Sequence, residues 1–299
     1  MAKESTRLDY GRRVQRVATF IAEHLDEDLT LERVAEIACF SPYHFHRIYR
    51  SITGETVMDT VRRQRLHRAA NELARSARPI AEVAKRAGYA SVEAFNRAFG
   101  SDHRDPPAAF RSRQSRLAKP PSDGDTMMNT VTIKSFDGAT VAALPHRGDY
   151  SRIGHCFETL TAWAGASGLL ATPRRWFAIY YDDPIASPEA DLRSEACLEI
   201  EPGQNLGPGM VERHIPAGRV ASVVHKGPYA ELERIYRELY GEWLPRSGEE
   251  PADRPAFEEY LNNPREVPPA EWLTEICLPL RESAPALPGE GSVARAGAR

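Results

Sequence analysis

One glutamate in a repeated strand pattern has the surroundings needed to bind an organic cation. Residues 257–264 repeat the pattern of residues 177–184, and one position changes from Ala178 in the first copy to Glu258 in the second. Side chains two residues apart on a strand share a face, so Glu258 and Tyr260 should lie together. A carboxylate beside aromatic rings attracts a lipophilic cation through charge pairing and cation–π attraction. The alternative is an ordinary solvated or ion-paired glutamate on a strand.

The same repeat predicts further aromatic residues around this glutamate. The equivalent strand of the first copy carries Trp176 and Tyr180. Tyr150 and Tyr229 end two matching His-[Arg/Lys]-Gly-x-Tyr motifs that precede predicted helices. These two tyrosines therefore either border the same groove or cap those helices. Trp272 is a further candidate for the groove.

A second group of residues has the composition of a DNA-reading surface. Residues 30–54 read as two helices joined by a tight turn, in which Thr30 caps the first helix and Ser41-Pro42 begins the second. The apolar residues of the second helix fall on one stripe. They leave an outward front of aromatic, imidazole and guanidinium groups that suits a DNA major groove, namely Tyr43, His46, Arg47 and Arg50.

This helix-turn-helix pattern recurs at residues 83–100, which predicts two DNA-reading units in one chain. The spacing of apolar residues over 58–73 predicts a connecting helix. Two units on a rigid rod can address two major-groove segments about 34 Å apart. The alternative for any single side chain is contact with phosphate or solvent alone. The front of the second unit consists of Val92, Glu93, Asn96 and Arg97.

Charge is distributed unevenly along the chain. The 299 residues carry a net charge of −3. Residues 1–120 hold 22 Lys and Arg against 15 Asp and Glu, a balance of +7, while residues 121–299 hold 17 against 27, a balance of −10. A basic first half suits binding to the phosphates of double-stranded DNA, and an acidic second half suits a cationic ligand.

Cysteine usage and hydropathy argue against several classes of protein. The four cysteines, Cys39, Cys156, Cys197 and Cys277, are far apart and in apolar contexts. We therefore expect reduced core residues of a cytoplasmic protein and no metal site. No apolar run reaches the roughly 18 residues of a membrane span. No nucleophile elbow, phosphate loop or metal motif is found, which predicts no catalytic site and no cofactor.

The order of the predicted elements indicates two domains of different class. We expect an all-α double helix-turn-helix domain at residues 9–113, a linker at 114–128, an α+β domain at 129–281 and a disordered tail at 282–299. The α+β domain consists of two strand-helix-strand-strand repeats. These should pair into one antiparallel sheet, with both helices on one face and a concave groove on the other.

Residues 9–113 resemble the DNA-binding domain of AraC-type transcription regulators. The sequence departs from that family at two turns. Cys39 stands where the family has a turn glycine, and Asp105 where it has a glycine, so the first turn should have altered geometry. The resemblance rests on Ser41-Pro42-x-x-Phe45-x-Arg47, Arg65-Leu66-x-x-Ala69, Gly88-Tyr89 and Phe95-x-Arg97-x-Phe99.

Residues 130–281 resemble the GyrI-like ligand-binding domain. The resemblance rests on the two His-[Arg/Lys]-Gly-x-Tyr motifs, on Tyr180-Tyr181-Asp182-Asp183-Pro184 and on Phe257-Glu258-x-Tyr260. It implies a ligand-responsive transcription regulator that senses a small hydrophobic, cationic effector and recruits RNA polymerase. The alternatives are a GyrI-like hydrolase, with a water activated by Glu258 and Tyr260 as proton donor, or a drug-sequestering module.

Overall fold

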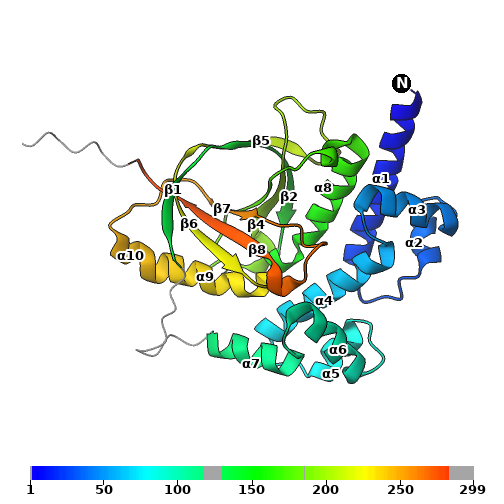
Figure 1. Ribbon diagram of the computed structural model, residues 1–299, viewed down its shortest axis with the longest axis horizontal. Coiled ribbons are helices and arrows are strands. Elements are labelled where there is room, and N and C mark those ends of the chain that lie inside the picture. Colours follow the sequence, from blue (N-terminus) through cyan, green and yellow to red (C-terminus); the bar gives the residue numbers. More distant parts are fainter. Residues whose placement is uncertain (1, 118–129, 185, 283–299) are drawn as a thin grey trace, which may run out of the picture.

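The computed structural model describes residues 2–117, 130–184 and 186–282 (Figure 1). The first of these segments is entirely helical apart from its turns, as predicted. Most of the predicted linker and nearly all of the predicted tail lie outside the described residues. The helices are α1 Ala2–Glu23, α2 Leu31–Ile37, α3 Pro42–Thr53, α4 Val57–Arg75, α5 Ile80–Arg86, α6 Val92–His103 and α7 Pro107–Leu117.

The predicted helix starts of the first DNA-reading unit are confirmed, and the second unit has a matching cap. The side chains of Thr30 and Ser41 accept hydrogen bonds from backbone N–H groups three residues later and so cap α2 and α3. Ser91 does the same for α6. The apolar stripe of α3, with Phe45 and Tyr49, is buried against α1, α2 and α4. The connecting helix is α4, which lies between the two units (Figure 1).

The turn after α2 keeps a left-handed backbone although it has no glycine. Cys39 has φ +53°, and Gly88, at the matching turn of the second unit, has φ +83°. The prediction of altered turn geometry is therefore wrong, because the backbone conformation is retained despite the side chain. Cys39 is also exposed, contrary to the prediction of a core cysteine, whereas Cys156, Cys197 and Cys277 are buried.

We expect Cys39→Gly to stabilise the protein by about 1 kcal/mol, because a left-handed conformation is unfavourable for a residue with a Cβ atom. Urea unfolding followed by circular dichroism measures the difference. The matched control is Gly88→Ala, which should destabilise the protein. The backbone of Gly88 has φ +83°, which is unfavourable for alanine, and an added Cβ atom would lie 2.4 Å from Arg65 Nη1. A destabilising Cys39→Gly would show that the thiol makes a favourable contact that outweighs the backbone strain.

The second domain is built on one antiparallel sheet of eight strands in the order β1-β6-β8-β7-β3-β4-β2-β5. The predicted repeat is confirmed, and each copy begins with one additional strand. The first copy consists of β1 Thr132–Phe136, β2 Ala139–Arg147, α8 Gly154–Ser167, β3 Trp176–Tyr180 and β4 Arg193–Glu199. The second consists of β5 Val211–Ile215, β6 Gly218–Lys226, α9 Leu232–Glu238, β7 Ala256–Tyr260 and β8 Leu273–Pro279, with the short α10 Leu244–Ser247 after α9.

The two faces of the sheet have different partners. On one face Phe136, Phe177 and Phe257 form a core enclosed by the curled sheet itself. The opposite face carries both α8 and α9, as predicted. Ala178 and Glu258 are paired across β3 and β7 and lie on this helix-bearing face. The prediction of a groove on the face without helices is therefore wrong, because the curl of the sheet fills that face with its own aromatic side chains.

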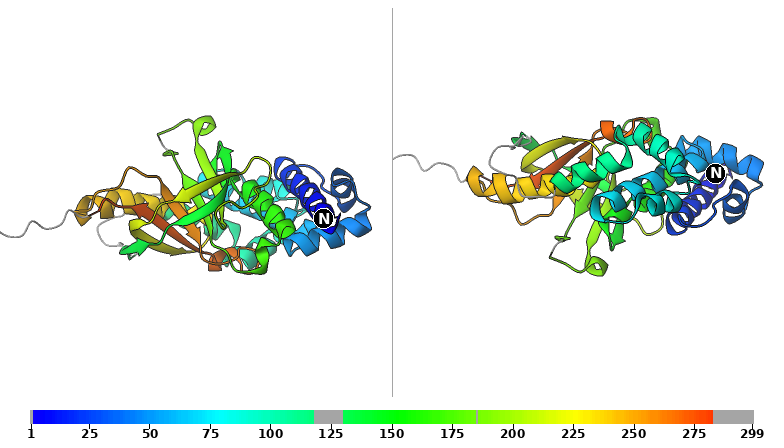
Figure 2. Two further views of the ribbon diagram at one scale, coloured as in Figure 1. Left: turned by 90° about the horizontal axis from the view of Figure 1, so that it is seen from above. Right: turned by 90° about the horizontal axis from the view of Figure 1, so that it is seen from below.

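The two domains are docked through α1 and α8. Figure 2 shows α1 (blue) beside α8 (green), and their contact is close because both helices present small residues. A Cβ atom at Gly11 would lie 2.2 Å from the Cβ atom of Ala166, and one at Gly165 would lie 2.4 Å from the carbonyl oxygen of Ile52. Helix α1 packs on both the first DNA-reading unit and α8.

Candidate ligand-binding cleft and DNA-reading helices

Glu258 lies buried among tyrosines in the middle of the helix-bearing face. Its side chain is only 2% exposed. Tyr260 donates a hydrogen bond to Glu258 Oε2 at 2.9 Å, and Tyr180 approaches the same oxygen at 3.5 Å. Tyr236 of α9 donates to Oε1 at 3.1 Å. The strand periodicity therefore placed Glu258 and Tyr260 correctly, whereas Tyr236 was missed because it comes from a different element.

The carboxyl group of Glu258 titrates near neutral pH. Burial raises its pKa to about 7, although the hydroxyl groups of Tyr260, Tyr236 and Tyr180 lower it in part. In the described part of the chain, no basic side chain forms an ion pair with Glu258. A buried carboxylate without a cationic partner is unfavourable. A bound organic cation would supply that partner.

The other aromatic candidates line the same cleft and differ in the contacts that they make. Trp176 lies beside Phe157 of α8. Tyr229 stacks on Trp272 at a centroid distance of 4.3 Å. The hydroxyl oxygen of Tyr150 lies 2.9 and 3.0 Å from the carbonyl oxygens of Asp182 and Arg193, so this tyrosine borders the cleft and also links the loop after β3 to the start of β4.

Helix α4 of the DNA-binding domain forms a wall of this cleft. The cleft encloses about 2450 Å³ and runs between the two domains. His67 of α4 faces the rings of Tyr229 and Trp272 across it, at centroid distances of 5.8 and 6.0 Å. Burial lowers the pKa of His67 to about 4, so its ring is neutral at pH 7 and does not repel a cation. Asn71 also lines the cleft from α4.

A network of four charged residues joins the domains next to this wall. Arg63 of α4 forms ion pairs with Glu55 at 2.6 Å and with Glu158 of α8 at 2.7 Å. Arg265 of the sheet domain pairs with the same two carboxylates. Glu158 is only 4% exposed. Although burial opposes ionisation, Arg265 and Arg63 lower the pKa of Glu158 to about 2.

Further ion pairs extend this interface along the basic domain. Arg75 at the end of α4 lies 3.3 Å from Asp149. Arg113 and Gln114 of α7 both bond to the buried Glu231. The opposite net charges of the two halves therefore contribute to domain docking.

The predicted DNA-reading side chains lie on two helices with solvent-exposed fronts. On α3, Arg47 and Arg50 are exposed and His46 is half-buried; the side chain of Tyr43 lies outside what the structure describes. On α6 the second front is likewise accessible, with Glu93, Asn96 and Arg97 exposed and Val92 half-buried.

Fold and cleft together define a protein with two DNA-reading helices and a separate small-molecule cleft. Residues 129–281 match the model of the GyrI-like small molecule binding domain, and residues 34–113 match that of a helix-turn-helix domain. The chain belongs to the GyrI-like family and joins its ligand domain to an AraC-type DNA-binding domain. In the described residues, no helix combines the length and the apolar character that crossing a membrane requires.

Two relatives of the N-terminal third of the chain are named as regulators. Regulatory protein SoxS of Escherichia coli (strain K12) is 32% identical over 106 residues, which are 36% of this chain and 99% of SoxS. The uncharacterized HTH-type transcriptional regulator YbfP of Bacillus subtilis (strain 168) is 34% identical over 108 residues, 36% of this chain and 37% of YbfP. The solved EcmrR C-terminal domain is 23% identical, covers 52% of this chain and all of that chain, and has a TM-score of 0.43.

Proposed function

We propose that this chain is a ligand-responsive transcription regulator whose effector is a lipophilic organic cation. The observation that carries the proposal is the Glu258 carboxyl group, 2% exposed and bonded by tyrosine hydroxyls from three positions. Charge pairing in a partly desolvated site is stronger than at an open surface. The surrounding rings add cation–π attraction.

The position of α4 supports a direct route from effector to DNA. This helix separates the two DNA-reading units, and its residues His67 and Arg63 line the cleft. A ligand that fills the cleft would contact α4 on one side and Glu258 on the other. If the ligand binds more tightly when α4 is in one position than in another, it favours that position. The spacing of α3 and α6 would then change, and with it the affinity for DNA.

A screen of organic cations tests this function. Thermal unfolding of the full chain should shift upward with a lipophilic cation, because a ligand that binds only the folded state stabilises it. The same compound should change transcription from a bound promoter in vitro. Recruitment of RNA polymerase stays a prediction, and the same transcription assay tests it. Binding of cations without any effect on transcription would favour the sequestering module.

We expect Arg47→Ala and Arg97→Ala each to weaken binding to an operator selected from random DNA. A bidentate base contact is worth about 1–3 kcal/mol, and its loss relaxes the sequence preference at one position. Loss of a phosphate contact weakens binding to all sequences equally. Fluorescence anisotropy with the selected operator and its single-base variants separates the two.

The matched control for these two variants is Arg246→Ala. Arg246 is exposed and lies in α10, at the other end of the molecule from α3 (Figure 1). Its removal should leave operator binding unchanged. Unaltered affinity in both Arg47→Ala and Arg97→Ala, with the fold intact, would refute the assignment of α3 and α6 as reading helices.

A second candidate function is hydrolysis of an electrophilic ligand in the same cleft. A carboxyl group with a pKa of about 7 is suited to general-base catalysis near neutral pH, and Tyr260, 2.9 Å away, could donate a proton. Incubation of each bound compound with the protein, followed by mass spectrometry, decides this. A product that the Glu258→Gln variant fails to form would establish an enzyme.

A further inference from the structure

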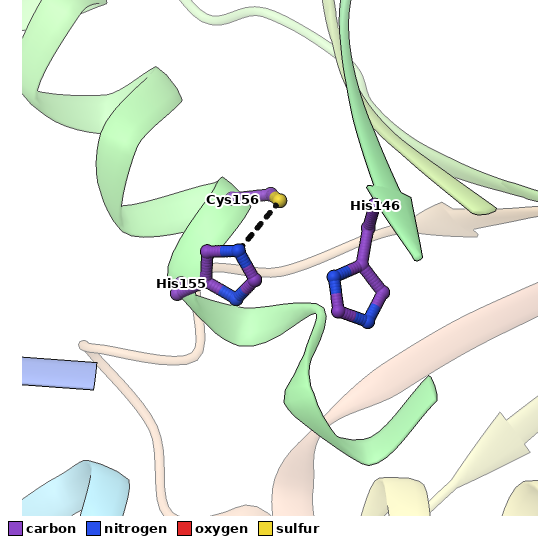
Figure 3. Close-up of side chains that lie close together, drawn as sticks. All are labelled: His146, His155 and Cys156. Carbon is purple, nitrogen blue, oxygen red and sulfur yellow. Dashed lines mark hydrogen bonds between the residues drawn. The ribbon is translucent and has the colours of Figure 1, made fainter. Parts of the chain in front are cut away.

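Two histidines and a cysteine form a cluster where α8 begins, beside the cleft. Each of His146, His155 and Cys156 offers one ligand atom, and these atoms all lie within 4.8 Å of one another. Their side chains gather around a common point (Figure 3). Cys156 Sγ lies 3.3 Å from His155 Nε2. Cysteine spacing alone predicted no metal site, because the fold, and not the sequence spacing, brings His146 of β2 to the other two residues.

Backbone carbonyl groups orient both imidazole rings. His155 Nδ1 lies 2.6 Å from the carbonyl oxygen of Arg152, and His146 Nε2 lies 3.0 Å from that of Asp149. A carbonyl oxygen only accepts, so each of these ring nitrogens carries the proton. The other nitrogens, His155 Nε2 and His146 Nδ1, keep their lone pairs. Histidines that bind metals are commonly oriented in this way, with the second N–H donated to a carbonyl group.

Comparison of the two copies of the internal repeat shows which residues of this cluster occur in both copies and which occur only in the first. The second copy keeps a histidine at the matching position, His225, which also bonds to a backbone carbonyl. It has Arg234 and Ile235 at the positions of His155 and Cys156. The orientation of His146 therefore belongs to the common fold, whereas the thiol and the second imidazole occur in the first copy alone.

We propose that His146, His155 and Cys156 bind a zinc ion. Two imidazole nitrogens and one thiolate are donors that Zn²⁺ accepts in three-ligand sites, and its bond lengths place tetrahedral ligand atoms about 3.3–3.6 Å apart. The distance of 3.3 Å between Cys156 and His155 already meets this requirement. His146 and His155 line the cleft, so the fourth position is accessible from it.

The same residues are poorly suited to nucleophilic catalysis. Cys156 is only 1% exposed. A reactive cysteine is partly exposed, whereas this sulfur is shielded from a substrate in solution. A zinc ion would displace the thiol proton on binding. We therefore expect zinc binding to release one proton from Cys156.

Cobalt titration of the full chain tests the proposal. The Cys39→Gly variant is the background, because Cys39 is the exposed cysteine of the described residues and would bind the probe. We expect one Co²⁺ per chain, a thiolate-to-cobalt charge-transfer band in the near ultraviolet, and loss of that band on addition of Zn²⁺. Cys197→Ser, at a buried cysteine on the opposite face of the sheet, is the control and should keep the band.

Two ligand variants complete the test. Cys156→Ser should abolish the charge-transfer band, and His155→Gln should lower zinc affinity by about 100-fold or more, since even outer-sphere changes cost about 10- to 100-fold. Urea unfolding of each variant shows that the fold is intact. The proposal is overturned if saturating cobalt gives no charge-transfer band, or if the band persists in Cys156→Ser.

Discussion

Glu258→Gln is expected to lower the affinity for a lipophilic cation by about 1–3 kcal/mol, the contribution of a charge-assisted contact. Glutamine keeps the shape of the side chain and removes its charge. A neutral isostere of the ligand, with carbon in place of the charged nitrogen, should bind the variant and the natural protein equally. Isothermal titration with both ligands measures the difference. Operator binding without ligand should persist, because Glu258 lies in the other domain.

The pH dependence of binding gives a second test of Glu258. With a pKa of about 7 the carboxyl group is protonated below neutrality, so cation affinity should fall about tenfold at pH 6 relative to its value well above pH 7. The affinity of Glu258→Gln should not change over this range. Glu259→Gln is the matched control, because Glu259 is the next residue on the strand and points to the opposite face. Equal losses in the two variants would show that Glu258 does not recognise charge.

Glu258→Gln should weaken cation binding but increase the stability of the folded protein. The pKa of Glu258 in the folded protein, about 7, lies above its ordinary value of 4.5. The protonated form therefore stabilises the fold fully below pH 4.5, and this stability is lost as the pH rises through 7. Above pH 7, Glu258→Gln should be more stable than the natural protein by about 3 kcal/mol. Denaturant unfolding at pH 8 and at pH 4.5 measures this gain and its loss.

Glu158→Ala is expected to destabilise the protein by about 3 kcal/mol, because it removes one of the two carboxylates that neutralise Arg63 and Arg265 and leaves Glu55 alone to pair with both. Glu158 is 4% exposed and pairs with Arg63 of the DNA-binding domain and with Arg265 of the sheet domain. Its pKa of about 2 means that this contribution is present above pH 4.5 and is lost only as the pH falls toward 2. Urea unfolding at pH 7 measures the change.

An exposed ion pair provides the control for Glu158. Glu250 and Arg281 lie 2.7 Å apart, and their side chains are 68% and 67% exposed. Glu250→Ala should therefore cost at most about 1 kcal/mol. Glu158→Ala should also reduce the effect of ligand on operator affinity, since Arg63 belongs to the helix that separates the reading units. If the ligand effect is unchanged in a folded Glu158→Ala protein, coupling runs through another contact.

Short-range patterns in the sequence were sufficient for the helices and the repeats. Caps such as Thr30 and Ser41 act on backbone groups within one turn, and strand alternation fixes which neighbours share a face. Both signals depend on residues close together in the chain. For that reason the helix starts and the pairing of Glu258 with Tyr260 followed from sequence alone.

Domain docking and the curl of the sheet depend on contacts between distant residues, and only the tertiary structure decided them. The curl fills one face with aromatic rings and so places the cleft on the helix-bearing face. Docking brings His67 to Tyr229 and Arg63 to Glu158, across separations of more than ninety residues in the chain. No periodic pattern in the sequence predicts such contacts, because each depends on the packing of whole helices and not on the spacing of neighbouring residues.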